Sequence, residues 1–283
     1  MLSEKKIQDI IDQKTLATDL SNSDLLEFCI LANESYRSGS PLITDENYDF
    51  IYISELQKRL PDHPFLQKIE SESEGFSDEK IKLPKKMLST DKAYTWGEIE
   101  KWLERISKFS EEINLQLSKI QIKGTAKLDG FAGYDDGEKL YTRGDGNKGS
   151  DISRVFQRGL GILNDSERGQ GPGEIVVKRS YFEDYLSNHF EYPRNFQASL
   201  IKEKELDKFA REAIDAKAAL FVPFKQLPFW QGNIDEFKNQ FLDIVIELEG
   251  GVDFDIDGVV FEIINLELKE FMGSNRKFHR WQI

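Results

Sequence analysis

The chain has 283 residues, of which 39% are hydrophobic and 12% aromatic, an ordinary balance for a globular protein. No apolar run reaches the roughly 20 residues of a membrane-spanning helix, and the polar N-terminus does not resemble a signal peptide. The single cysteine, Cys29, excludes an intrachain disulfide and a cysteine-based zinc site. We therefore expect a cytoplasmic protein without a membrane partner.

The formal net charge is -13, and it is unevenly distributed along the chain. Residues 1–78 contain 7 basic and 16 acidic residues, so most of the excess negative charge lies in the first part. This asymmetry favours two units with different partners. It also argues against broad, nonspecific binding of a nucleic-acid backbone by this chain alone.

The first 70 residues have the apolar spacing of helices. Apolar residues recur at intervals of three and four from Leu25 to Tyr36, and a second helix is expected between Thr44, a candidate N-cap, and Pro61. Residues 71–86 are polar without a clear period, which is typical of a linker. We predict a small helical domain over 1–70 and a linker over 71–86.

Residues 87–283 alternate irregularly between helix and strand patterns. Strands are predicted over 120–127, 131–135, 139–143, 174–178, 218–224 and 257–264. Helices are predicted over 96–109, 151–160, 180–188, 199–214 and 234–248. This irregular order predicts an α+β fold with largely antiparallel sheets.

A candidate nucleophile lies in Lys127-Leu128-Asp129-Gly130, directly after a strand pattern. A lysine must lose its proton before it attacks phosphorus or carbon, and a nearby carboxylate can orient the amine or accept that proton. If the strand continues through the motif, Lys127 and Asp129 point to the same face. These four residues alone are more typical of a solvated surface lysine before a turn, because most lysines are simply solvated.

Gly144 to Gly149 fits the G-x-G-x-x-G pattern of dinucleotide-binding folds. The preceding strand patterns are joined by Asp136-Gly137, a strong hairpin signal, whereas that fold requires a parallel sheet. We therefore interpret the glycines as a turn that presents Arg143 to a phosphate.

Carboxylates and one tyrosine supply further candidates. Glu174 and Asp257 each begin a strand pattern beside glycine, where they can bind ribose hydroxyls or a divalent metal. Asp45, Tyr48 and Asp49 have the spacing of one helix face. Such a face is either a solvated acidic stripe or a patch for a cationic ring, with Tyr48 as the stacking platform.

Together these pieces resemble the N-terminal part of bacterial-type NAD-dependent DNA ligases. The pieces occur in the order of that family and span most of the chain. They are the acidic helix, Met87-Leu88-Ser89 with Ala93-Tyr94, Lys127-Leu128-Asp129-Gly130, Thr142-Arg143-Gly144-Asp145-Gly146, Gly173-Glu174, Pro193-Arg194-Asn195, Asp257-Gly258-Val259-Val260 and Arg280-Trp281.

The resemblance implies an enzyme that uses NAD and Mg²⁺ or Mn²⁺ in DNA replication or repair. The helical domain would bind the nicotinamide mononucleotide half of NAD, and residues 87–283 would form a nucleotidyltransferase domain. Lys127 would attack the adenylate phosphorus and release nicotinamide mononucleotide, and the adenylate would later pass to the 5′-phosphate of nicked double-stranded DNA. The implied catalytic residues are Lys127, Asp129, Arg143, Glu174 and Asp257, with Glu174 and Asp257 also as metal ligands. The implied cofactor-binding residues are Tyr36, Asp45, Tyr48, Asp49, Ser89, Leu128, Arg194, Val259 and Trp281.

Four departures from the family pattern are visible. Glu262 replaces a lysine five residues after Asp257, and Thr125 replaces a glutamate two residues before Lys127. Ser35-Tyr36 replaces a tyrosine-histidine pair, and the sequence ends at Ile283, before the family's last motif lysine. DNA contacts are therefore expected from domains outside this sequence or from a second ligase subunit.

Two alternatives remain at this point. Glu262 and the missing lysine are compatible with a degenerate NAD-binding module without catalysis. Several lysine-adenylating enzymes share K-x-D-G, so a nucleotidyltransferase that uses ATP is the other alternative. Asp45, Tyr48 and Asp49 argue against ATP, because ATP carries no nicotinamide ring.

Overall fold

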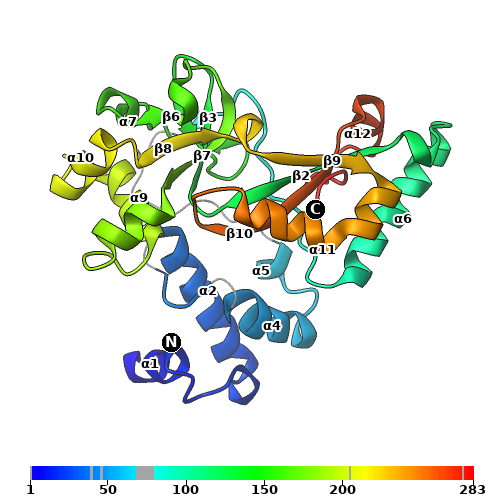
Figure 1. Cartoon of the computed structure of the whole chain (residues 1–283). Coiled ribbons are helices and arrows are strands. Elements are labelled where there is room, and N and C mark those ends of the chain that lie inside the picture. The colour runs from blue at the N-terminus through cyan, green and yellow to red at the C-terminus, as the bar shows by residue number, and fades with distance from the viewer. Residues whose placement is uncertain (1, 39–40, 45–46, 68–79, 204, 276) are drawn as a thin grey trace.

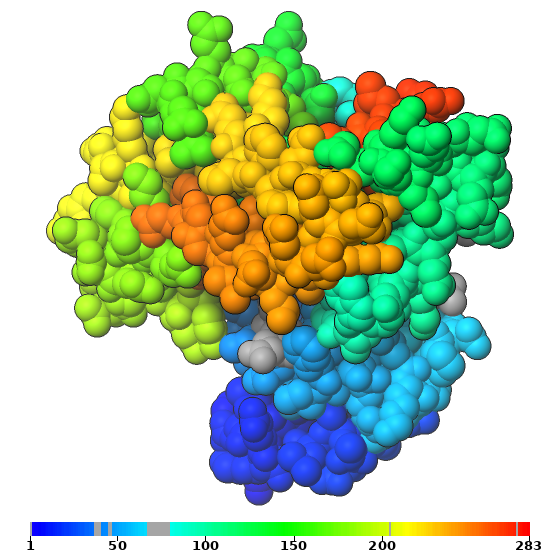
Figure 2. Space-filling view, turned by 45° about the vertical axis from the view of Figure 1, so that its right-hand side comes forward, coloured from blue at the N-terminus to red at the C-terminus, as the bar shows by residue number. Residues whose placement is uncertain are grey.

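The helices of the N-terminal part lie apart from the β-sheets in the computed structural model (Figure 1). The structure describes residues 2–38, 41–44, 47–67, 80–203, 205–275 and 277–283. In the space-filling view of Figure 2 the N-terminal part forms its own lobe, which contacts the rest of the molecule along one side.

The N-terminal lobe has its own apolar core. Its elements are α1 (Glu4–Ile11), a 3-10 turn (Ala17–Asp19), α2 (Asn22–Ser38), a π-helical segment (Tyr48–Ile53), α4 (Ser54–Arg59) and α5 (Pro64–Gln67). Phe28 and Tyr52 pack with ring centroids 4.7 Å apart at the centre of this core. The Arg59 guanidinium donates to the carbonyls of Ala17, Thr18 and Leu20 and so holds the turn before α2.

A three-stranded antiparallel sheet has the strand order β10-β2-β9. Its strands are β2 (Gln121–Leu128), β9 (Phe229–Asn233) and β10 (Ile256–Ile263), and the helices around it are α6 (Trp96–Glu112), α11 (Ile234–Gly250) and α12 (Leu266–Met272). A 3-10 turn (Leu117–Lys119) precedes β2. Trp102, Phe237 and Phe261 fill the core between this sheet and its helices. A capping box at Thr95 and Glu98 begins α6.

A five-stranded sheet has the order β4-β3-β7-β8-β6. Its strands are β3 (Phe131–Asp135), β4 (Leu140–Thr142), β6 (Gly161–Ile162), β7 (Gly171–Val177) and β8 (Ala219–Pro223). The segments around it are α7 (Arg154–Gln157), α8 (Arg179–Tyr181), a π-helical segment (Phe182–Leu186), α9 (Pro193–Lys202), α10 (Lys208–Asp215) and two 3-10 turns (Leu163–Asp165 and Phe224–Gln226). A separate pair joins β1 (Ile81–Lys82) to β5 (Lys148–Gly149). Leu128 and Val176 belong to one buried cluster, so the two sheets pack against each other beside the end of β2.

The predicted α+β class and the mostly antiparallel pairing are confirmed, with β6–β8 as a parallel pair. The hairpin at Asp136-Gly137 is also confirmed, since β3 and β4 pair antiparallel. The single helix predicted over 199–214 is wrong. The structure has two helices in this range, because α9 ends at Lys202 and Asp207 caps the start of α10. The predictions also missed the strands β1, β5, β6 and β9.

The predicted linker over 71–86 lies mostly outside the described residues, and its described part includes β1. Among the residues that the structure describes, no helix combines the length and apolarity needed to cross a bilayer.

Candidate functional site

Lys127 and Asp257 meet across neighbouring strands. Lys127 is the penultimate residue of β2, and its Nζ donates to Oδ2 of Asp257 on β10. In the β10–β2 register Ile256 pairs with Leu128 and Gly258 pairs with Lys127, so Asp257 is an extra residue without a partner. Such a bulge re-aims a side chain, and Gly258 permits it by adopting a φ of 142°.

Asp257 is held in an environment that disfavours its charge. Burial raises the pKa of the Asp257 carboxyl, while the positive charges of Lys127 and Lys92 lower it. The nearby negative charge of Asp129 also raises the pKa of Asp257. A carboxylate with a raised pKa is a better proton acceptor than an exposed one, which suits it to a lysine that must lose a proton.

Asp129 is fixed by side chains from two helices. Its Oδ1 accepts from Tyr36 Oη at 2.9 Å and from Arg194 Nη1 at 2.9 Å. The Arg194 guanidinium also donates to the Gly130 carbonyl at 2.6 Å and lies over the rings of Tyr36 and Phe131, 3.9 Å and 4.6 Å from their centroids. Asp129, two residues after the predicted nucleophile Lys127, is thus tied to both α2 and α9.

Gly130 and Glu174 lie close together between the sheets. A Cβ on Gly130 would come within 2.6 Å of Val176 Cγ1 and 2.8 Å of Glu174 Cγ, and it would also overlap the Ile175 carbonyl. Only glycine allows this close approach. Glu174 is buried on β7, where it pairs with Ala132 of β3 and Val222 of β8.

Arg143 lies at the start of the glycine turn and contacts Ser89. Its Nη1 donates to Ser89 Oγ at 3.1 Å, and its backbone N–H donates to Ala132. Gly144 and Gly146 have φ values of 54° and 85°, which explains the glycines of this turn. The pattern is therefore a tight turn beside antiparallel strands and not a dinucleotide-binding βαβ unit.

Asp49 joins the helical lobe to the segment before α6. Its Oδ2 accepts from Lys92 Nζ at 2.5 Å. Phe50 packs edge-on against the Tyr94 ring at 5.0 Å. Partial burial, followed by the negative charge of Asp49, raises the pKa of the Tyr94 phenol.

The other two residues of the predicted acidic face differ from Asp49. Tyr48 packs against the lobe core, and its hydroxyl donates to the Cys29 carbonyl at 3.3 Å. Asp45 lies outside the described residues.

Three predicted residues are not beside Lys127. Leu128 is buried on the opposite face of β2, and Val259 pairs with Ala126 on that same face. Trp281 bonds the backbone of Ile263, which pairs with Ile122, roughly 16 Å along the strand from Lys127. Its ring lies under Lys269 Nζ and stacks on His279.

Glu262, one of the departures, is part of an ion pair. Lys269 Nζ lies 2.7 Å from Glu262 Oε2, and both side chains are largely buried. Glu262 pairs with Lys123 across the sheet, so it shares the face of Lys127 at the other end of β2.

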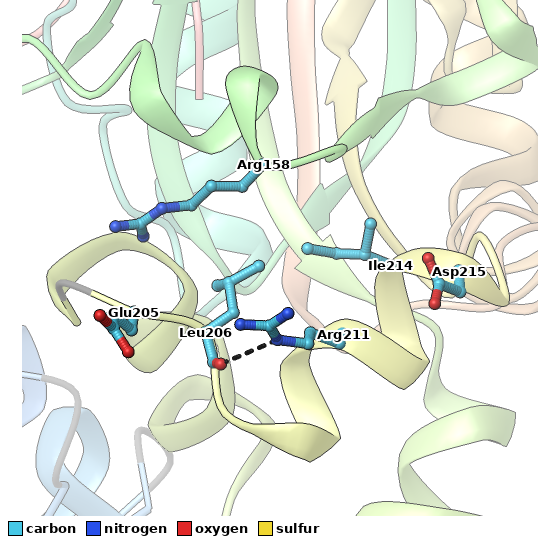
Figure 3. A pocket seen from close by; sticks show the side chains of 6 residues that line it. All are labelled: Arg158, Glu205, Leu206, Arg211, Ile214 and Asp215. Carbon is cyan, nitrogen blue, oxygen red and sulfur yellow. Dashed lines mark hydrogen bonds between the residues drawn. The ribbon is translucent and has the colours of Figure 1, made fainter.

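A surface cavity of about 540 Å³ lies elsewhere, between α7 and α10 (Figure 3). Its lining residues are Arg158, Glu205, Leu206, Arg211, Ile214 and Asp215. Arg211 Nε donates to the Leu206 carbonyl at 3.1 Å, as the dashed line in Figure 3 shows. None of the predicted site residues lines this cavity.

Sequence reasoning missed three residues around the site, namely Lys92, Gln197 and Asp255. Gln197 donates to the Asp129 carbonyl at 3.3 Å, and the Asp255 carbonyl accepts from Asp129 N–H. The alternation of Asp253, Asp255 and Asp257 was a usable signal for Asp255. Lys92 had no such signal, because only the folded chain brings it to Asp49.

Comparison with known proteins identifies the protein family that the chain resembles. Residues 76–216 match the family model described as the NAD-dependent DNA ligase adenylation domain. A DNA ligase of Vesicomyosocius okutanii is 58% identical over 283 residues, which is 100% of this chain and 45% of that protein. A DNA ligase of Ruthia magnifica is 60% identical over 265 residues, which is 94% of this chain and 43% of that protein. A DNA ligase of Desulfotalea psychrophila is 49% identical over 99% of this chain and 41% of its own length. The chain thus spans less than half the length of these relatives.

Proposed function

Because this chain belongs to the NAD-dependent DNA ligase family and contains its adenylation domain, we propose that it transfers adenylate from NAD to Lys127. Lys127 Nζ attacks the adenylate phosphorus of NAD. The bond from that phosphorus to the oxygen of nicotinamide mononucleotide breaks, and nicotinamide mononucleotide leaves. The product is a lysine-adenylate.

The observation that carries this proposal is the contact between Lys127 Nζ and the Asp257 carboxylate. A protonated lysine is no nucleophile, and Asp257 is positioned to hold the amine and to accept its proton. Since burial raises the pKa of Asp257, proton transfer to it is easier than to a solvated carboxylate.

Asp129, Glu174, Arg143 and Ser89 are proposed to hold the adenylate half. Asp129 and Glu174 flank Gly130, where their carboxylates can accept hydrogen bonds from ribose or adenine. The planar fork of Arg143 suits phosphate oxygens, and its bond to Ser89 orients it. Leu128, Val259 and Trp281 act indirectly in this proposal, through the strands that carry the site.

The helical domain of 1–70 is proposed to bind the nicotinamide mononucleotide half. Asp49 supplies a negative charge, and Phe50 and Tyr94 supply aromatic surface beside it, a combination that attracts a cationic ring. Tyr36 contacts Arg194 and Asp129, and we propose that it lies where the two halves of NAD meet. Asp45 and Tyr48 complete the set that the family resemblance implies.

Glu174 and Asp257 are proposed to hold Mg²⁺ or Mn²⁺. Among the described residues no three His, Cys, Asp or Glu side chains form a metal-binding group. Magnesium commonly binds through one or two carboxylates together with substrate phosphates, so these two residues fit that requirement. The partly buried Asp257 carboxylate is also a group whose charge a cation would stabilise. A bound metal would neutralise charge on the reacting phosphate.

We propose nick sealing as an activity of a full-length protein, one as long as the DNA ligase relatives. There the adenylate would move from Lys127 to the 5′-phosphate of nicked DNA. Contacts with double-stranded DNA would come from parts beyond this sequence, or from a second subunit.

Intact-mass measurement after incubation with NAD and magnesium tests the proposal. We expect the mass of one adenylate on the wild-type chain and none on a Lys127→Ala variant that retains its circular dichroism spectrum. An adduct that forms with ATP and not with NAD would identify ATP, in place of NAD, as the adenylate donor. Ligand binding without any adduct would instead support a non-catalytic NAD-binding module.

A further inference from the structure

Lys92 is a cation at the site that the sequence patterns did not assign. It lies in the segment between β1 and α6, and its Nζ is 2.5 Å from Asp49 Oδ2. The Lys92 side chain is 58% exposed, whereas that of Asp49 is 16% exposed. The ion pair therefore joins a solvated, flexible lysine to a carboxylate that is mostly removed from water.

Lys92 belongs to a segment that also contacts the proposed phosphate site. Ser89, three residues before Lys92, accepts a hydrogen bond from Arg143 at 3.1 Å. Tyr94, two residues after Lys92, packs against Phe50 of the helical lobe. The short segment of 89–94 thus connects the Asp49 carboxylate of the helical lobe with the arginine that is proposed to hold phosphate.

Other cations of the site are held more firmly than Lys92. The Arg194 side chain is 9% exposed, and its guanidinium binds Asp129, the Gly130 carbonyl and the Tyr36 carbonyl. Lys127 is 36% exposed and bound to Asp257, and it must lose its charge to react. Lys92 has the most exposed side chain of the three.

Asp49 cannot easily lose its counter-charge without a replacement. Removing one partner from a mostly buried ion pair leaves an uncompensated charge, which is strongly unfavourable. A ligand that carries a cationic ring supplies such a replacement. A ligand without that ring leaves Lys92 on Asp49.

We propose that Lys92 exchanges partners when NAD binds. The nicotinamide ring replaces the ammonium group at Asp49, and the released Lys92 binds the diphosphate between the two halves of NAD. There it stabilises the negative charge that grows on the leaving phosphate. Because ATP has phosphates but no cationic ring, the same exchange selects NAD over ATP. This inference rests on the proposed function and names the residue that links donor recognition to bond cleavage.

The test compares three ligands on the full chain with Lys92→Met, which removes the charge but keeps most of the aliphatic stem. The ligands are nicotinamide riboside, which has the cationic ring without phosphate, NAD, and ATP. Binding is measured by NMR titration. Lys238→Met, a change at an exposed lysine of α11, is the matched control.

The proposed exchange predicts that Lys92→Met changes the affinities for nicotinamide riboside and for NAD in opposite directions. Lys92→Met binds nicotinamide riboside more tightly than wild type, because no lysine competes for Asp49. The same variant binds NAD about 10-fold more weakly, because a charge-assisted hydrogen bond to phosphate is lost. Its rate of lysine-adenylate formation at saturating NAD falls, and Lys92→Arg recovers most of that rate.

Three results would overturn the proposal. They are a weaker affinity of Lys92→Met for both nicotinamide riboside and NAD, unchanged affinities for both, or no riboside binding by the wild type. A merely structural role of Lys92 gives the first of these. Failure of the proposed function would give a different result, because the wild-type chain would then form no adenylate on Lys127 with NAD.

Discussion

The Asp257 carboxylate reaches Lys127 Nζ because Asp257 is the unpaired residue of a bulge in β10. Without that extra residue, regular pairing would put the position before Gly258 on the other face of the sheet. The bulge therefore turns a strand residue into a partner for the amine.

Asp257→Asn is expected to separate activity from stability. The rate of lysine-adenylate formation should fall about 100-fold, because asparagine cannot accept the proton of Lys127. Burial raises the pKa of Asp257, so its charged form disfavours the folded state above that pKa. The Tm at pH 7 should accordingly stay level or rise. Glu249→Gln, at an exposed carboxylate of α11, is the control for loss of negative charge. A large drop in Tm for Asp257→Asn would contradict this account.

Tyr36→Phe removes one hydrogen bond to Asp129 and keeps the ring over Arg194. We expect about 1 kcal/mol less free energy of unfolding in urea and a modest fall in adenylation rate. Tyr36→Ala also removes the ring contact with the guanidinium, so its effect on both quantities should be larger. Equal effects of the two variants would show that the ring contributes nothing.

Gly130→Ala should destabilise the fold by about 1–3 kcal/mol, the usual range for an overpacked core. The added Cβ would lie 2.6 Å from Val176 Cγ1 and would overlap the Ile175 carbonyl, which cannot rotate away. The matched control is Gly97→Ala in α6, whose Cβ would have its nearest neighbour at 4.0 Å. That change should stabilise the protein by about 0.5–1 kcal/mol, as alanine favours a helix. Urea denaturation of both variants checks the difference in sign.

Glu262 and Lys269 should behave as a coupled pair. Glu262→Lys would place two ammonium groups together where the ion pair now measures 2.7 Å, and it should lower the free energy of unfolding by about 1 kcal/mol. The exchange of both residues, Glu262→Lys with Lys269→Glu, should recover most of that loss. A double-mutant cycle in urea, including Lys269→Gln, measures the coupling. Additive effects would mean that the pair contributes nothing.

His279 should make the protein sensitive to mild acid. Burial, followed by the charges of Lys85 and Lys269, lowers the pKa of His279 below its ordinary value of 6.5. The folded state therefore prefers the neutral ring. The stability that this adds is complete above pH 6.5 and is lost as the pH falls from there toward the folded-state pKa. The slope of Tm against pH in that window should flatten in His279→Gln, and partly in Lys85→Met. An unchanged slope in both variants would rule out His279 as its source.

The sequence patterns predicted the strands around Lys127 well, because those strands are long and alternate regularly. β2 follows its predicted bounds within a residue, and partly buried and fully buried residues alternate along it. The short strands β1, β5 and β6 have two residues each, which is too few to show a period. The break between α9 and α10 was missed because residues 203–207 contain no proline or glycine, the usual signals at the end of a helix.

The candidate site was predictable where it depends on neighbours in sequence. The order of Lys127, Arg143, Glu174 and Asp257 could be read from the motifs, but the contacts of Arg194 and Lys92 could not. Arg194 reaches Asp129 from α9, and Lys92 reaches Asp49 from a segment without regular structure. Such contacts depend on how separate elements pack, and no local period encodes them.

β2 is the central strand of its sheet, with β10 on one side and β9 on the other. Its backbone amides should consequently be among the slowest in the protein to exchange with deuterium, opening only when the sheet unfolds. A chemical group attached to Lys127 would therefore be carried by a strand that does not open locally. The Asp49 contact involves an exposed lysine, and it is at such contacts that the protein can move to admit and release small molecules. Time-resolved exchange should find its fastest ligand-dependent changes in residues 47–53 and 89–95, and almost none in β2.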